Sequence, residues 1–198
     1  NAYMESIEVL RQTVDAKDPY TRGHSDRVAD YSVLIGKHMG LSEKDLKTLK
    51  IGGLFHDIGK IGVPDHILLK PGKLTDDEYS EIKNHPSIGA HILSTATIFA
   101  DLIPVVKHHH ERYDGFGYPG KLKGSEIPFL ARIAAVADTY DAMTSRRPYR
   151  DALPLDVVKA EIEKCSGTQF DPEIAKVFLD LLENHYDEVE KIQNSYYE

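Results

Sequence analysis

The stretch GGLFHDIGKIGVPD, residues 52–65, places a histidine and an aspartate side by side near the end of an apolar segment. Apolar residues recur around this pair at helical spacing, which indicates a helix with a buried face. Adjacent helical residues diverge by about 100°, so His56 and Asp57 cannot both point straight into water. Because burying polar side chains without partners is costly, the pair requires partners from elsewhere in the chain.

Other histidines and one aspartate occupy comparable places, at predicted helix ends or in apolar runs. They are His24, His85, His109, His110 and Asp138. Taken singly, each is more often a capping or surface residue than a ligand. Together with His56 and Asp57 they spread over five segments beside a glycine-rich loop, and imidazole with carboxylate is the ligand set of Fe, Mn, Zn or Ni. Two metals about 3.5–4 Å apart need a shared ligand, and Asp57 is the natural bridge.

The elements that must position these residues have helical periodicity almost throughout. We predict helices over residues 2–16, 25–39, 42–57, 75–86, 87–93, 99–110, 128–140, 155–164 and 171–192. Ser42, Thr75 and Asp171 are suited to cap three of them at the N-terminus. No alternating pattern indicates a strand, so the sequence predicts one compact all-α domain over 17–198. The helix over 1–16 is predicted to connect it to a preceding segment.

Composition limits the classes of function. The 198 residues carry a net charge of −8, and 41% are hydrophobic, as in a soluble globular protein. Such a charge offers no basic stripe for long nucleic acid, although a local site can still bind a small anion. A single cysteine, Cys165, and the lack of a long apolar run fit a cytoplasmic setting. The chain starts at Asn1 rather than Met, so we expect a piece of a longer protein whose upstream part could include a membrane anchor.

Six blocks of the sequence resemble the HD-GYP family, a branch of the HD-domain metal-dependent phosphohydrolases. The blocks are YTRGHSDRVADYS, LFHDIGKIGVPDHILLKPGKLTDDEY, NHPSIGAHIL, HHERYDGFGYPGKLKGSEIP, ARIAAVADTYDAMTSRRPYR and GTQFDPEI. The resemblance runs from about residue 18 to residue 178. It implies an all-α fold and phosphodiesterase activity on the bacterial messenger cyclic di-GMP.

The resemblance also implies roles for individual residues. The seven candidate ligands correspond to the metal ligands of the family, with Asp57 bridging, and Lys60 to a lysine that contacts the scissile phosphate. Gly117 and Tyr118 belong to the GYP signature. For the loop that contains them, a role in lining the substrate cleft is favoured over a role as a plain connector between two helices. Arg147 and Arg150 fall where the family places ligand-holding basic residues, although TSRRPYR could be only a solvated loop.

One departure from the family concerns the number of metals. Some members bind a third metal with a glutamate four residues before the first histidine, and this chain has Tyr20 there. A phenol with a pKa of about 10 is a poor ligand near neutral pH. We therefore predict two divalent metals, with Fe or Mn favoured and Zn, Co or Ni as further occupants.

These observations predict a cyclic di-GMP phosphodiesterase in which a hydroxide bridging the two metals attacks phosphorus. The product would be linear pGpG, and a second cut would give GMP. Two alternatives stay open, namely an HD-GYP phosphodiesterase for another cyclic dinucleotide and a non-catalytic messenger-binding or adaptor module. Expected partners are an upstream sensory or receiver domain and a diguanylate cyclase domain that binds the GYP loop.

The remaining histidines are interpreted as structural or surface residues without a role in the site. They are His38, His66, His91, His108 and His185.

In the loop over residues 111–127, Arg112 and Asp114 could be a local pair that shapes the backbone.

Overall fold

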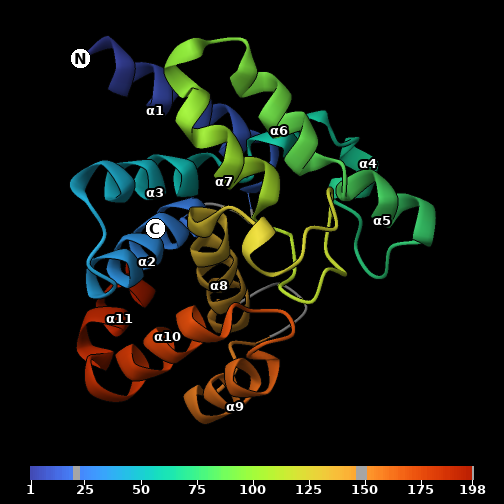
Figure 1. Cartoon of the computed structure of the whole chain (residues 1–198). Coiled ribbons are helices and arrows are strands. Elements are labelled where there is room, and N and C mark those ends of the chain that lie inside the picture. Colours follow the sequence, from blue (N-terminus) through green and yellow to red (C-terminus); the bar gives the residue numbers. More distant parts are fainter. Residues whose placement is uncertain (20–22, 146–150, 198) are drawn as a thin grey trace.

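Helices supply the regular structure of the computed structural model, which describes residues 1–19, 23–145 and 151–197 (Figure 1). The α-helices are α1 (Ala2–Lys17), α2 (His24–His38), α3 (Glu43–Phe55), α4 (Asp65–Leu68), α5 (Asp76–Ile82), α6 (His85–Ser94), α7 (Ile103–His108), α8 (Phe129–Thr144), α9 (Leu155–Cys165), α10 (Pro172–Asn184) and α11 (Tyr186–Gln193). Short 3-10 segments are η2 (Ile58–Gly62), η3 (Thr97–Leu102) and η4 (Gly124–Glu126). Within the described residues there is no named β-strand, which confirms the predicted all-α class.

The predicted N-terminal caps are confirmed. The Ser42 hydroxyl accepts from the Asp45 amide at the start of α3. Thr75 and Glu78 form a reciprocal capping box on α5. Asp171 accepts from the Glu173 amide at the start of α10. These side chains satisfy backbone donors that have no partner inside the helix, which is why local sequence alone located them.

The helix predicted over 42–57 ends at Phe55 as α3, and the helix predicted over 75–86 ends at Ile82 as α5. Three further predicted helices differ from the structure. The segment predicted over 99–110 divides into η3 and α7, and Pro104 lies in the first turn of α7. The segment predicted over 171–192 divides at His185 into α10 and α11. The helix predicted from Ser87 begins at His85, because Pro86 needs no hydrogen-bonded amide in a first turn. The four-residue α4 is too short to produce a recognisable period.

Two clusters of buried apolar side chains hold the helices together. The first gathers residues of α2, α3 and α8–α11, including Val28, Tyr31, Ile133, Tyr140 and Phe178. The second gathers residues of α1, α3, η2, α6, η3 and α7, including Ile7, Phe55, Ile58, Leu93 and Phe99. Helix α3 contributes to both, through Leu49 and Phe55. It therefore connects the lower and upper helices of Figure 1.

Helix α1 packs on the second cluster through one face. Ile7 and Val14 are 2% and 8% exposed, and Lys17 donates to the carbonyl of Ile61 over 2.7 Å. The segment predicted as a connecting helix is thus also part of the packed structure.

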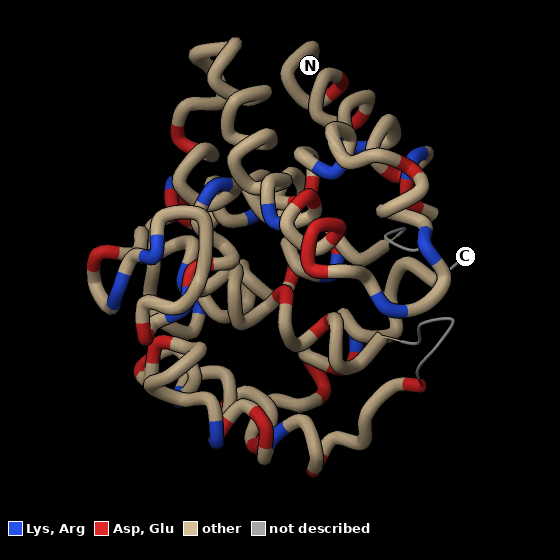
Figure 2. Tube along the Cα trace, turned by 90° about the vertical axis from the view of Figure 1, so that its right-hand side faces the viewer, with Lys and Arg blue, Asp and Glu red and all other residues tan. Residues whose placement is uncertain are grey.

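Charge is distributed rather than concentrated. In Figure 2, the blue Lys and Arg segments and the red Asp and Glu segments are scattered along the tube. None of the helices in the described part of the chain is long and apolar enough to cross a membrane.

The close contact between η2 and the start of α6 depends on a glycine. A Cβ atom on Gly59 would lie 1.7 Å from the carbonyl oxygen of His85 and 2.6 Å from the amide nitrogen of Gly89. Both are backbone atoms, which cannot rotate away. Only glycine lets η2 approach α6 closely enough to set His85 beside the residues that precede η2.

Gly59→Ala is therefore expected to force η2 and α6 apart and to lower the free energy of unfolding by about 3 kcal/mol. Urea denaturation measures this loss. Gly62→Ala is the matched control in the same 3-10 segment, because its Cβ would meet only side-chain atoms of Ile88, at 3.0 Å or more. Equal stabilities of the two variants would contradict the close-approach argument.

Candidate metal centre

The first group of predicted ligands joins the start of α2, the end of α3 and the middle of α8. His24 is the first residue of α2, His56 is the C-cap of α3, and Asp138 lies within α8. His24 Nε2 lies 3.0 Å from Asp138 Oδ1 and 3.2 Å from His56 Nε2. One ligand atom from each of the three residues lies within 4.8 Å of the others, a spacing that one metal ion could bridge.

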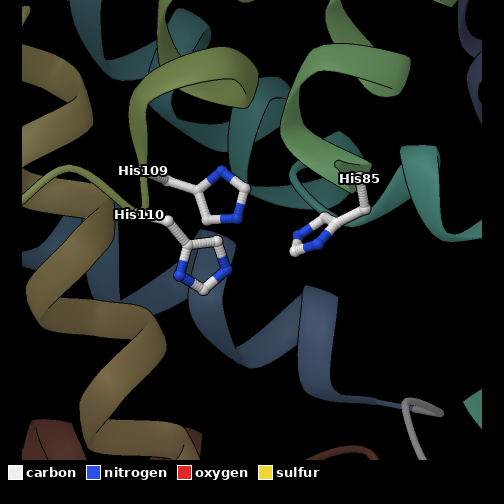
Figure 3. A group of neighbouring side chains, drawn as sticks. All are labelled: His85, His109 and His110. Atoms are coloured by element: carbon white, nitrogen blue, oxygen red, sulfur yellow. The ribbon is translucent and has the colours of Figure 1, made fainter. Parts of the chain in front are cut away.

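The second group consists of three histidines from two helix ends. His85 begins α6, whereas His109 is the C-cap of α7 and His110 follows it. Figure 3 shows the three rings gathered in one place. The ring centroids of His109 and His110 lie 4.3 Å apart, and those of His85 and His110 lie 5.0 Å apart. Their ligand atoms also lie within 4.8 Å of one another.

Asp57 lies between the two groups, where α3 passes into η2. Its Oδ2 atom is 3.2 Å from His56 Nε2 and its Oδ1 atom is 3.3 Å from His85 Nε2. The residue is 4% exposed. Each carboxylate oxygen thus faces a different histidine group, which is the geometry expected of a bridging ligand.

Backbone carbonyls fix the orientation of three of the rings. The Nδ1–H groups of His56, His85 and His109 donate to the carbonyls of the residues three positions earlier. These acceptors are Gly53, Ile82 and Val106, at 2.6, 2.7 and 2.8 Å. A histidine whose Nδ1 carries the proton presents an unprotonated Nε2 to a metal.

The unsatisfied atoms of the centre match a cation. His85 Nε2 and His109 Nε2 are buried without a hydrogen-bond partner, and His85 Nε2 makes none with Asp57 despite their 3.3 Å separation. Buried polar atoms are normally satisfied. A divalent transition metal would satisfy both, and the set of imidazoles and carboxylates suits one.

The two groups differ in their electrostatics. In the first group, burial alone would lower the pKa values of His24 and His56, but the neighbouring carboxylates, Asp138 among them, raise both. At Asp57, between the groups, burial alone would raise the pKa, but His56 and Lys60 hold it well below its usual range. In the second group, burial lowers the pKa of His109 well below its usual value and that of His110 to about 4. Both imidazoles are therefore neutral near pH 7, as metal ligands must be.

A buried aspartate that the sequence analysis missed supports His24. The Nδ1–H of His24 donates to Asp141 Oδ2 over 2.7 Å, and the guanidinium of Arg27 donates to both oxygens of Asp141, at 2.6 and 3.2 Å. Asp141 is fully buried. Spacing gave a signal, because Asp141 lies three residues after Asp138 and Arg27 three after His24, and such positions share a helix face.

The C-terminal segment also contacts Arg27. The guanidinium of Arg27 donates to the carbonyl of Ser195 over 3.3 Å, and its central carbon lies 4.4 Å from the ring centroid of Tyr197. Contacts of this kind hold a cation without removing its charge. The end of the chain thus helps to orient the pair that supports His24.

Lys60 lies one turn beyond Asp57 and reaches the centre. Its Nζ atom is 3.2 Å from Asp57 Oδ2 and 3.9 Å from Asp18 Oδ2. Burial alone would lower the pKa of Lys60, but Asp57 and Asp18 raise it, so the ammonium stays charged. Its side chain is 18% exposed, which leaves it reachable from solvent.

The GYP segment packs directly against the second histidine group. The ring of Tyr118 stacks on that of His110, with centroids 4.9 Å apart and planes inclined by 15°. A Cβ on Gly117 would lie 2.3 Å from the amide nitrogen of Arg112, so this position accepts only glycine. The Tyr118 amide donates to the His110 carbonyl over 3.2 Å. These contacts place Tyr118 at the edge of the centre.

Glu111 is a second carboxylate that sequence reasoning missed. It is 4% exposed and accepts from the amides of Gly120 and Leu122, at 2.5 and 3.1 Å. It therefore holds the loop that follows the GYP residues against the end of α7. Nearby, Arg112 and Asp114 form a bidentate pair at 3.1 and 2.8 Å, so the predicted local pair is confirmed.

Three residues named in the sequence analysis fall outside the part of the chain that the structure describes. Arg147 and Arg150 belong to residues 146–150, and Tyr20 belongs to residues 20–22. Their predicted roles, ligand binding for the arginines and the absence of a third metal for Tyr20, stay predictions.

Comparison with known proteins gives matches over most of the chain. A family model described as "HD domain" matches residues 8–174. A cyclic di-GMP phosphodiesterase of Thermotoga maritima is 44% identical over 89% of this chain and 49% of its own length. A 3'3'-cGAMP-specific phosphodiesterase of Vibrio cholerae is 42% identical over 94% of this chain and 41% of its own length. The chain thus spans less than half of the length of these relatives.

Solved structures give the same fold at lower sequence identity. A cyclic GMP-AMP-specific phosphodiesterase of Vibrio cholerae superposes with a TM-score of 0.71 at 20% identity, over 96% of this chain and 53% of that one. An HDG"Y"P protein of Bdellovibrio bacteriovorus, Bd1817, has a TM-score of 0.68 at 20% identity, over 81% of this chain and 52% of that one. At this identity the likeness concerns the fold alone.

The support of His24 by Asp141 leads to a prediction on metal affinity. Asp141→Ala removes the acceptor of the His24 Nδ1 proton, and loss of such an outer partner typically costs about 10- to 100-fold in metal affinity. Calorimetric titration of the wild-type and variant apoproteins with Mn²⁺ measures this loss of metal affinity.

Ser145→Ala is the control, because the Ser145 hydroxyl donates to the same Asp141 carboxylate over 3.1 Å but does not touch His24. Circular dichroism checks that both variants are folded. If folded Asp141→Ala bound Mn²⁺ as tightly as the Ser145 variant, Asp141 would have no part in the centre.

Proposed function

The chain belongs to the HD-domain family, in its HD-GYP branch, and on this premise we propose that it is a metal-dependent phosphodiesterase that hydrolyses cyclic di-GMP. The product is linear pGpG, and a second hydrolysis gives GMP. One observation carries the proposal, namely that the two oxygens of Asp57 face two separate histidine groups. A shared carboxylate of this kind suits a centre of two divalent ions.

We propose that each histidine group holds one ion and that Asp57 contacts both. His24, His56 and Asp138 complete the first set, and His85, His109 and His110 complete the second. Ligand sets rich in histidine suit Fe or Mn, with Zn, Co and Ni as further occupants, because geometry and supply decide more than affinity.

When two such ions are bound, they supply an acidified water as nucleophile and charge relief on the phosphate. The residues of the chain then position the substrate. The ammonium of Lys60, charged and partly exposed beside Asp57, contacts a non-bridging phosphate oxygen. A fixed cation of this kind acts most strongly where water is scarce.

The GYP segment bounds the substrate site on the side of the second histidine group. Tyr118, stacked on His110, offers a flat face on which a guanine base can lie. Gly117 keeps the loop against the end of α7. Arg147 and Arg150 are proposed to bind phosphate or base edges, since a guanidinium fork matches both.

A second candidate substrate is 3'3'-cGAMP. The observation that favours it is the similarity, 42% over 94% of this chain, to a Vibrio cholerae protein named for that substrate. The third reading, a non-catalytic adaptor, fits the centre less well, because all seven predicted ligands and Lys60 are present and the described contacts bring them together.

Partners and location follow from the proposed reaction. Since the chain spans less than half of its relatives' length, we propose an upstream sensory or receiver domain and cytoplasmic action on the messenger. Phe116, beside the GYP residues, is 83% exposed, and this loop is the proposed contact for a diguanylate cyclase domain.

Purified protein loaded anaerobically with Fe(II) or Mn(II) is expected to hydrolyse cyclic di-GMP faster than 3'3'-cGAMP. Asp57→Ala should abolish turnover and lower the metal content, because the carboxylate common to both groups is gone. Asp180→Ala, which removes an exposed carboxylate on α10, is the control. A preference for 3'3'-cGAMP would establish the second candidate, and binding without turnover would establish the adaptor.

Lys60→Ala separates substrate handling from metal binding. The metal content should stay at the wild-type level while kcat/KM falls roughly 100-fold, the size typical of one lost charge-stabilising donor. Lys159→Ala, which breaks a surface ion pair with Glu183, should change neither quantity. Wild-type kinetics in folded Lys60→Ala would remove this residue from the mechanism.

A further inference from the structure

A third cluster of potential metal ligands lies on the surface, away from Asp57. His38 ends α2, His185 links α10 to α11, and Glu188 lies in the first turn of α11. One ligand atom from each residue lies within 4.8 Å of the others. The sequence analysis assigned both histidines to structural or surface roles, and 147 positions of sequence separate them.

The fold itself creates the cluster. The chain turns at His185, and α11 then packs on α2 with Val189 fully buried in the first apolar cluster. This packing brings the first turn of α11 to the end of α2. The three side chains come from segments that are already fixed by the core, so a ligand would find them assembled.

The distances suit ligands of one metal better than hydrogen bonds. His38 Nε2 and His185 Nδ1 lie 3.5 and 3.7 Å from the same oxygen, Glu188 Oε2. Both separations exceed the usual range for N–H···O bonds, about 2.7–3.2 Å. In a tetrahedral zinc site with bonds near 2.1 Å, neighbouring ligand atoms lie about 3.4 Å apart. The observed separations of 3.5 and 3.7 Å are close to this distance between neighbouring ligand atoms.

An ion-pair network is the competing explanation, and it is less favourable. It requires both rings to be protonated for full attraction to Glu188, although their centroids lie only 4.9 Å apart. Two imidazolium ions at that distance repel each other. The exposed fractions of the His38 and Glu188 side chains, 29% and 48%, would further weaken an ion pair.

We propose that His38, His185 and Glu188 form a surface site for one zinc ion, with solvent completing the coordination. Two imidazoles and one carboxylate are an established zinc ligand set with an open position. The site joins the end of α2 to the α10–α11 turn. The three side chains lie together only in the folded protein. Zinc bound to them therefore stabilises the folded state relative to the unfolded state.

The site also bears on the metal count of the protein. With zinc present, elemental analysis would return one ion more per chain than the centre around Asp57 holds. That ion would not come from the position of Tyr20.

Zinc binding by the whole chain tests the site. Apoprotein and the double variant His38→Gln/His185→Gln are saturated with Zn²⁺, freed of excess, and analysed for zinc per chain. The variant should bind one equivalent less. His91→Gln, which removes another exposed histidine, should bind as the wild type does.

Thermal unfolding gives a second readout. Excess Zn²⁺ should raise the midpoint by several degrees more in the wild type than in the double variant. With Mn²⁺ alone, metal content at the centre and phosphodiesterase activity should be equal in the two proteins, so failure of the proposed function would show in that measurement and not in the zinc count. Equal zinc content and equal thermal shifts would show that the cluster is an ion-pair network and overturn the proposal.

Discussion

The buried carboxylate of Asp57 is the constraint on which the rest of the structure depends. A carboxylate that is 4% exposed would be costly without partners, and its partners come from three directions. His56 and Lys60 lie on either side of it in the chain, and His85 arrives from α6 because Gly59 allows η2 to approach that helix closely. The close packing of η2 on α6 and the charge interactions of His56 and Lys60 therefore both act on the Asp57 carboxylate.

Helix ends supply most of the remaining architecture of the centre. The last carbonyls of a helix lack intrahelical partners, and here they orient three of the histidines that we propose as ligands. The ring of His56 donates to a carbonyl of the last turn of α3, that of His85 to the last residue of α5, and that of His109 to a carbonyl of α7. The same backbone groups thus satisfy their own hydrogen bonding and select the tautomer that presents Nε2 to a cation.

The sequence predicted the parts of this arrangement that depend on local patterns. Helical period and caps located most of the helices, and the setting of His56 and Asp57 beside an apolar face predicted that they need partners. Asp141 and Glu111 were missed because their partners are tertiary or lie in an irregular loop. Asp141 binds His24 from 117 positions away. The turn at His185 was missed because the apolar period continues through it, while the packing of Val189 on α2 decides the direction of α11.

The most direct test of the role of Asp57 is anomalous diffraction at the manganese edge from crystals of the Mn²⁺-loaded protein. Two peaks are predicted at the centre, one on each side of the Asp57 carboxylate, with the first beside His24 and the second beside His109. A single peak there, or two peaks of which neither contacts Asp57, would contradict the account of a carboxylate that joins two metal sites.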